Sequence, residues 1–153
     1  MFGKIIRVVD NYIYVENRME KLETNLIGYH LVFSDTSKQL VGEIINISIK
    51  EIEVLLIGEI KDNKFIAGII KKPSSNCSIR VINKKEVEYL LGSQDYSNKA
   101  NLLIGKSLIY DNYKVTADKN KFFSGHFAVL GNTGSGKSCA MARLLQNLFY
   151  SND

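Results

Sequence analysis

Hydrophobic and polar residues alternate in short runs along the first seventy residues, a pattern typical of β-strands. The clearest run, residues 52–60, places Ile52, Val54, Leu56 and Ile60 on one face and glutamates on the other. A second run predicts a strand whose shared face holds Val41, Ile45, Ile47 and Ile49. Further strands are expected at residues 5–9, 12–15, 26–33, 65–70 and 78–82.

Asp-Asn pairs separate several of these runs, at residues 10–11, 62–63 and 111–112. Both residue types tolerate the left-handed conformations of two-residue hairpin turns. The last pair predicts a hairpin between strands at residues 107–110 and 113–116. Five to seven short strands with such turns predict a mainly β fold, a small closed barrel or sandwich.

The chain's only proline, Pro73, lies in a polar break after the strands. Beyond it Asn83 is placed to cap a short helix, with Glu86 three residues on and Gly92 past its end. We therefore expect a β-barrel domain at residues 1–72, then a connector with a short helix and a hairpin at residues 73–125. Residues 126–153 are expected to begin a second domain.

The second domain opens with Gly131–Ser138, which fits the pattern G-x-x-x-x-G-K-[ST] of a phosphate-binding P-loop. An apolar run at residues 127–130 predicts a buried strand before it. The amphipathic segment from Lys137 to about Tyr150 predicts a helix after it. Strand, glycine-rich loop and helix are the context that this motif requires.

The motif predicts an ATP and magnesium site, because glycines let backbone N–H groups face phosphate oxygens at a helix N-terminus. Lys137 would reach the outer phosphates and the Ser138 hydroxyl would ligate Mg²⁺. The alternative, an ordinary turn with a solvated Lys137, fits poorly, because a cation gains nothing at the positive end of a helix dipole. Asn132 fits a phosphate contact and a plain loop role equally well. The predicted cofactor-binding residues are Gly131, Asn132, Thr133, Gly134, Ser135, Gly136, Lys137, Ser138 and Cys139.

Only fifteen residues follow Ser138, whereas a P-loop domain needs further strands and an acidic residue for magnesium. We expect the chain to be the N-terminal part of a longer ATPase, truncated within its second domain and with no catalytic residue of its own. The apolar face of the last helix should then pack against another chain or the barrel, or be poorly ordered.

Composition is that of a globular protein, with 45% hydrophobic and 24% charged residues and a net charge of +4. The lysine pairs at residues 71–72 and 84–85 fit a solvated surface or, less readily, a nucleic-acid contact. Cys77 and Cys139 lack metal-ligand spacing and are interpreted as reduced thiols. Neither a signal peptide nor a run of transmembrane length is recognisable, so the prediction is a cytoplasmic protein without a membrane partner.

The string from His126 to Ser138, HFAVLGNTGSGKS, resembles the Walker A region of the HerA–FtsK superfamily of ring-shaped DNA motors, most closely the HerA branch. HerA-type proteins also begin with a small β-barrel, and residues 3–6 with residues 42–44 suit its usual opening. The family often has histidine at the position of His126, but the preferred explanation is a polar residue where a strand begins.

The resemblance implies a RecA-like α/β ATPase domain, a hexameric ring and double-stranded DNA passing through its channel. It also implies partners such as a nuclease or an NAD-hydrolase effector in antiviral defence. Because the Walker B strand and arginine finger of the family are not in the chain, independent ATPase activity is not expected. Two alternatives are a partner-docking barrel module and a rotary- or secretion-type ATPase, whose usual Gly-x-x-Gly-x-Gly-Lys-Thr loop differs from this one. DNA substrate, polarity, effector and ring size are left open.

Overall fold

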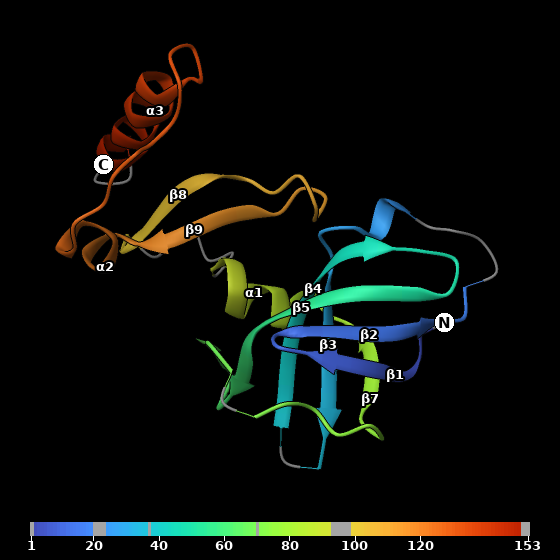
Figure 1. Cartoon of the computed structure of the whole chain (residues 1–153). Helices are drawn as coiled ribbons and strands as arrows, with labels where there is room; N and C mark the ends of the chain where they lie inside the picture. The colour runs from blue at the N-terminus through green and yellow to red at the C-terminus, as the bar shows by residue number, and fades with distance from the viewer. Residues whose placement is uncertain (1, 20–23, 37, 70, 93–98, 151–153) are drawn as a thin grey trace. The chain divides into compact units, whose positions relative to one another are not determined.

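The computed structural model describes residues 2–19, 24–36, 38–69, 71–92 and 99–150, which form a mainly β protein with few helices (Figure 1). Two compact units share the chain, Met1–Leu90 and Leu91–Asp153. The expected boundaries at residues 72 and 125 stay predictions. The first unit contains β1 (Phe2–Val9), β2 (Tyr12–Asn17), η1 (Thr24–Leu26), β3 (His30–Asp35), β4 (Lys38–Ile47), β5 (Glu51–Lys61), β6 (Lys64–Ala67), β7 (Ser78–Val81) and α1 (Lys84–Leu91).

The first unit is a seven-stranded antiparallel sheet in the order β1-β2-β5-β4-β3-β7, with β6 beside β5. The sheet curls, and its end strands β1 and β7 contact each other. No ladder joins these two strands among the described residues. The mainly β prediction is therefore confirmed, and the expected barrel is present as a curled half-barrel.

Two of the three Asp-Asn pairs form the predicted hairpin turns. Asp62 and Asn63 both have positive φ, 51° and 58°, and join Lys61 directly to its cross-strand partner Lys64, as a type I′ turn requires. Asp10 has a φ of 52° between β1 and β2. The strand expected from residue 26 begins only at residue 30, because η1 and a turn at Gly28, with a φ of 87°, precede it.

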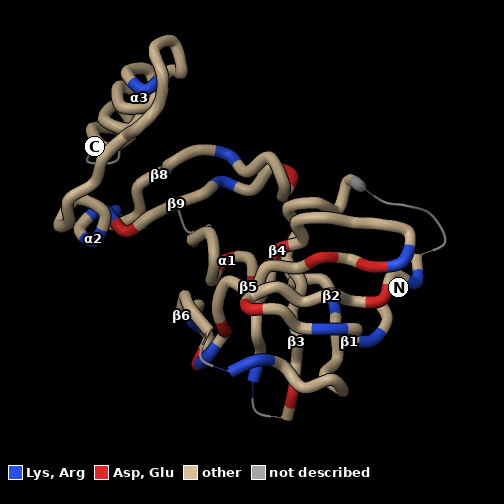
Figure 2. The backbone as a smooth tube through the Cα atoms, in the orientation of Figure 1, with Lys and Arg blue, Asp and Glu red and all other residues tan. Residues whose placement is uncertain are grey.

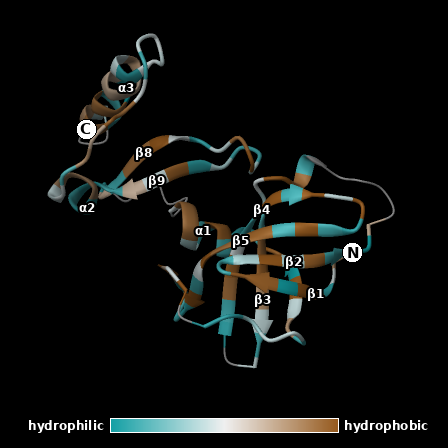
Figure 3. Cartoon of the chain, viewed as in Figure 1, coloured by the Kyte–Doolittle hydropathy of each residue, from teal (hydrophilic) through white to brown (hydrophobic). Residues whose placement is uncertain are grey.

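The hydrophobic core lies inside the curled sheet, where hydrophobic positions recur along the strands (Figure 3). Ile52, Val54 and Leu56 of β5 are buried in it, as the alternation predicts. The shared face predicted for this strand is wrong at Ile45, because the register of β4 against β5 shifts between Val41 and Gly42 and again between Ile44 and Asn46. Such bulges invert the alternation, so Ile44 is buried and Ile45 is not. The prediction is also wrong at Ile49, which lies beyond the end of β4 and is 84% exposed.

The predicted capping box of α1 is confirmed. The Glu86 backbone N–H donates to Asn83 Oδ1 (3.0 Å), and the Asn83 N–H donates to Glu86 Oε2 (3.0 Å). The buried Glu86 carboxylate also accepts two hydrogen bonds from the Arg80 guanidinium, at 2.7 and 2.6 Å. Arg80 on β7 therefore ties the helix start to the sheet, and Gly92 follows the helix with a φ of 91°.

The second unit contains β8 (Asn101–Lys106), β9 (Lys114–Asp118), α2 (Lys119–Ser124) and α3 (Lys137–Tyr150). The hairpin is real, but the strand expected at residues 107–110 is wrong. Those residues form the connection, in which the Ser107 hydroxyl accepts from the N–H groups of Ile109 (3.1 Å) and Tyr110 (3.0 Å). A serine side chain that bonds the following N–H groups favours a turn over a ladder.

Helix α3 has the predicted bounds and contacts β8 of its own unit. Asn147 Nδ2 donates to the Leu103 carbonyl of β8 (2.8 Å), and Leu148 on the same face is half-buried. This neighbour within its own unit was not expected. No residue of α3 is buried, however, and Phe149 is 70% exposed, so packing of its apolar face against another chain or the barrel stays a prediction. The strand expected at residues 127–130 is wrong. No ladder partner for it exists among the described residues, and Leu130 is 89% exposed.

The Arg80–Glu86 contact makes the stability of the first unit depend on pH. Hydrogen bonding from Arg80 lowers the pKa of Glu86. A lowered carboxyl pKa stabilises the fold above the unfolded value of about 4.3, and this contribution is lost as pH falls through the lower folded value. We expect Glu86→Gln to reduce the free energy of unfolding by about 1–2 kcal/mol at pH 7, because the hydrogen bonds from Arg80 lose their charged acceptor. The loss is no larger because Arg80 is partly exposed to solvent.

Urea unfolding at pH 7 and at pH 3 measures this effect, and the difference between wild type and variant should shrink at the lower pH. Glu88→Gln on the same helix is the matched control, because no hydrogen bond or ion pair joins Glu88 to the described residues. A difference that is independent of pH, or equal in both variants, contradicts the assignment.

Candidate phosphate-binding loop

Residues 131–136 form an exposed loop that leads directly into α3. It lies at the end of α3 away from the C mark (Figure 1). All nine predicted cofactor-binding residues fall in this loop and the first turn of the helix. The first N–H groups of a helix have no partner within it and carry partial positive charge. The structure therefore places these residues beside the first N–H groups of α3, which have no hydrogen-bond partner within the helix.

Two glycines of the loop adopt conformations that other residues avoid. Gly134 has a φ of 82° and Gly136 a φ of 83°. A Cβ added to either would meet no heavy atom within 4 Å, so backbone conformation and not crowding requires glycine here. Left-handed residues alternating with ordinary ones turn successive N–H groups toward one concave side, which suits an anion.

Gly131 is constrained differently. A Cβ there would lie 2.6 Å from the Ser135 hydroxyl oxygen. The Ser135 N–H donates to the Asn132 carbonyl (3.1 Å), which closes a tight turn between these positions. Close approach of the Ser135 side chain thus favours the first glycine, although rotation of that side chain would relieve the contact, and left-handed backbone requires the other two.

Lys137 reaches back across the loop. Its Nζ donates to the carbonyl oxygens of Gly131 (2.7 Å) and Asn132 (2.6 Å). Both acceptors are neutral, and no carboxylate forms an ion pair with Lys137 among the described residues. The ammonium group therefore lies over the loop without a counter-charge, where an anion would supply one.

The remaining predicted residues are accessible. Thr133, Ser138 and Cys139 are exposed, and Cys139 is a free thiol. Ser138 lies in the first turn of α3, while His126 lies in the segment before the loop that forms no strand. Within the described part of the chain no cluster of three or more His, Cys, Asp or Glu residues could hold a metal. A magnesium ion here would depend on Ser138 and on the phosphates themselves.

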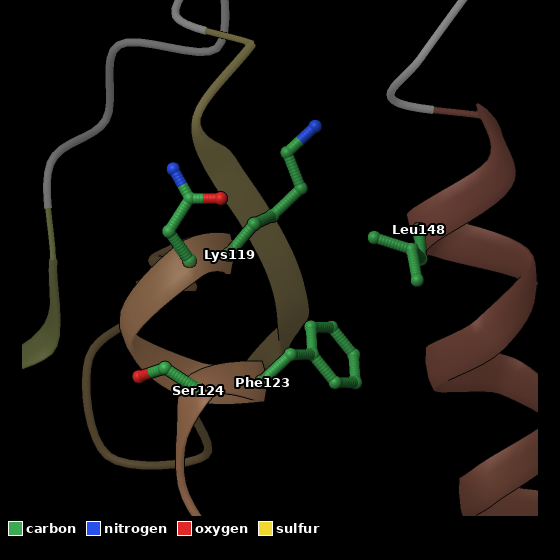
Figure 4. A pocket seen from close by; sticks show the side chains of 5 residues that line it. Lys119, Phe123, Ser124 and Leu148 are labelled. Atoms are coloured by element: carbon green, nitrogen blue, oxygen red, sulfur yellow. The ribbon is translucent and has the colours of Figure 1, made fainter.

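A separate hollow of about 440 Å³ lies in the same unit (Figure 4). Phe123 of α2 and Leu148 of α3 point toward one another in it. Leu148 follows Ser138 by ten residues, about 15 Å along the helix, so the hollow is not part of the loop.

The sequence analysis did not predict this hollow, because it did not predict α2. The signal for α2 was present, since the Asp118 carboxylate that accepts from the Lys121 N–H (2.9 Å) is a recognisable helix cap. The residues that line the hollow are Lys119, Asn120, Phe123, Ser124 and Leu148.

None of the helices in the described ranges has the length and apolar character needed to cross a membrane.

Comparison with known proteins links both units to one family. Residues 102–153 match the family model described as the central domain of helicase HerA. Over 97% of its length the chain is 27% identical to a protein of Methanocaldococcus jannaschii named "Probable DNA double-strand break repair helicase HerA". The chain spans 29% of the length of that relative. These two matches confirm the resemblance stated above: the chain is similar to HerA-type ATPases over nearly its whole length.

Proposed function

We propose that residues 131–138 bind the phosphates of ATP, and that the chain contributes this site to an ATP-driven DNA translocase of HerA type. The observation that carries the proposal is the Lys137 ammonium, which bonds two neutral carbonyls of a loop that also holds two left-handed glycines at a helix N-terminus. The fit is specific to a compact anion, because the donors are backbone N–H groups and one ammonium. The match to the HerA central domain supports the same assignment.

In this proposal each residue has a distinct role. The N–H groups of Gly134 and of residues 136–138 surround the inner phosphates, while the Ser135 N–H closes the turn to Asn132. Lys137 exchanges one carbonyl acceptor for an outer phosphate oxygen, and the Ser138 hydroxyl ligates Mg²⁺. The bound Mg²⁺ would offset the charge of the phosphates, and the chain's own part is to bind and orient them. Cys139 lies beside the site without a proposed chemical role.

The wider function rests on the resemblance. A RecA-like α/β domain, a cytoplasmic hexameric ring, passage of double-stranded DNA through it and pairing with a nuclease or an antiviral NAD-hydrolase effector belong to this proposal. The relative is named as a DNA repair helicase, which supports the DNA part. The rotary- and secretion-type alternative is less favoured, because both matches are to HerA.

Lys137→Ala should weaken binding of a fluorescent ATP analogue in the presence of Mg²⁺ by on the order of ten- to a hundredfold, because charge-assisted hydrogen bonds are lost. Lys121→Ala, which removes an exposed lysine of α2 in the same unit, is the matched control and should leave binding unchanged. Fluorescence titration of the purified proteins measures both affinities. Equal affinity in wild type and Lys137→Ala would rule out the phosphate contact.

Gly136→Ala should also lose nucleotide binding, because a left-handed conformation costs a residue with a Cβ roughly 1–2 kcal/mol and relaxation of the loop would turn its N–H groups away. Gly125→Ala provides the comparison, because Gly125 has an ordinary φ of −105° and equal open space around its Cβ. The same titration, with circular dichroism to check folding, tests the pair. A folded Gly136→Ala protein with wild-type affinity would show that the left-handed backbone is not needed.

A further inference from the structure

The segment that leads into the phosphate-binding loop, residues 126–130, has no backbone support among the described residues. It forms no strand, and no backbone hydrogen bond joins it to another described element. Ion pairs do not hold it either, because the chain has no Lys, Arg, Asp or Glu from Phe122 to Gly136. Figure 2 shows this stretch as an uncharged run between α2 and α3. The position of the segment therefore depends on side-chain packing.

Three aromatic rings, here called the phenylalanine cluster, supply this packing. The ring centroids of Phe122 and Phe123 on α2 are 5.1 Å apart, and the Phe127 ring lies 5.3 Å from the first and 6.1 Å from the second. At such distances aromatic pairs attract one another beyond the area that they bury. Phe127 is still 47% exposed, so its ring lies against the outside of the pair on α2.

Helix α2 offers a fixed base for the phenylalanine cluster. Asp118 caps its first turn, the Ser124 hydroxyl donates to the Lys121 carbonyl (3.1 Å), and the helix contacts β9. On the other side of the loop, Asn147 holds α3 against β8. Two different contacts within one unit therefore restrain the two ends of the phosphate-binding loop.

We propose that Phe127 is a positioning residue for the nucleotide site: through the phenylalanine cluster it fixes the start of the loop before phosphates bind. The proposal rests on the proposed function of residues 131–138. Gly131 follows Phe127 by four residues, and its carbonyl accepts from Lys137 (2.7 Å). The position of the segment therefore influences where the ammonium lies. A loop that is ordered in advance loses less conformational entropy on binding, so it binds more tightly.

Titration of the full chain with a fluorescent ATP analogue and Mg²⁺ tests the proposal. Phe127→Ala should weaken binding by about three- to tenfold, because the aromatic contacts that order the segment are lost. Phe127→Tyr keeps the ring at a half-exposed position and should restore nearly the wild-type affinity. The matched control is Leu130→Ala, which lies nearer to the loop but is 89% exposed and outside the cluster. It should change the affinity by no more than about twofold.

A double-mutant cycle shows whether the effect acts through the ring contact. Phe122→Ala should weaken binding although it lies on α2, outside the segment. The double variant Phe122→Ala/Phe127→Ala should lose little more than the larger single loss, because both changes remove the same contact. Losses that multiply in the double variant would show two independent effects and would contradict the proposal.

Amide hydrogen exchange across residues 131–138 of the nucleotide-free protein measures the order of the loop directly. Exchange should be faster in Phe127→Ala and in Phe122→Ala than in wild type or Leu130→Ala. If Phe127→Ala does not fold, Phe127→Leu replaces it, because leucine keeps apolar volume without the ring.

A folded Phe127→Ala protein with wild-type affinity or wild-type exchange overturns the proposal, as does an equal loss in Leu130→Ala. Failure of Phe127→Tyr to restore binding overturns it as well. Lys137→Ala separates this outcome from failure of the proposed function. If Lys137→Ala loses binding and Phe127→Ala does not, the nucleotide site stands without this role for Phe127. If Lys137→Ala binds as wild type does, the nucleotide site itself is rejected.

Discussion

Strand β5 is the element on which the first unit depends, because β2, β4 and β6 all pair with it. Its buried face supplies three residues of the core, Ile52, Val54 and Leu56. The other face carries glutamates, and Glu51 and Glu53 accept hydrogen bonds from Arg7 (2.8 Å) and from the Tyr14 hydroxyl (2.7 Å). One strand therefore organises both the apolar interior and the polar exterior of the half-barrel.

Backbone pairing also explains where the second unit departs from expectation. The apolar run at residues 127–130 has the composition of a buried strand, yet a strand exists only where neighbours satisfy its N–H and C=O groups. None of the described strands pairs with it, and Phe127 and Val129 are 47% and 43% exposed. Helix α3, whose hydrogen bonds are internal, forms with its predicted bounds. Local signals thus suffice for the helix and not for the strand.

The same distinction separates what sequence predicted from what it missed. Turns and caps are local, and the Asp62-Asn63 turn and the Asn83–Glu86 box were predictable from adjacent residues. The bulges in β4 depend on how two strands meet, with Gly42 facing Val54 at a distance that leaves no room for a Cβ. Periodicity alone therefore predicted that Ile45 is buried in the core, whereas the buried residue is Ile44. In the candidate site the order of residues was predictable, whereas the reach of Lys137 to two carbonyls was not.

Side-chain contacts hold the charged groups of the described chain in two different ways. Arg7, Arg18 and Arg80 each have a carboxylate partner within 2.8 Å. A folded chain gains little from an exposed ion pair, so these arginine contacts mainly fix geometry. Lys137 instead donates to two neutral carbonyls of its own loop. Those two contacts hold the ammonium beside the loop at the N-terminus of α3, where a phosphate from outside the chain would supply the counter-charge.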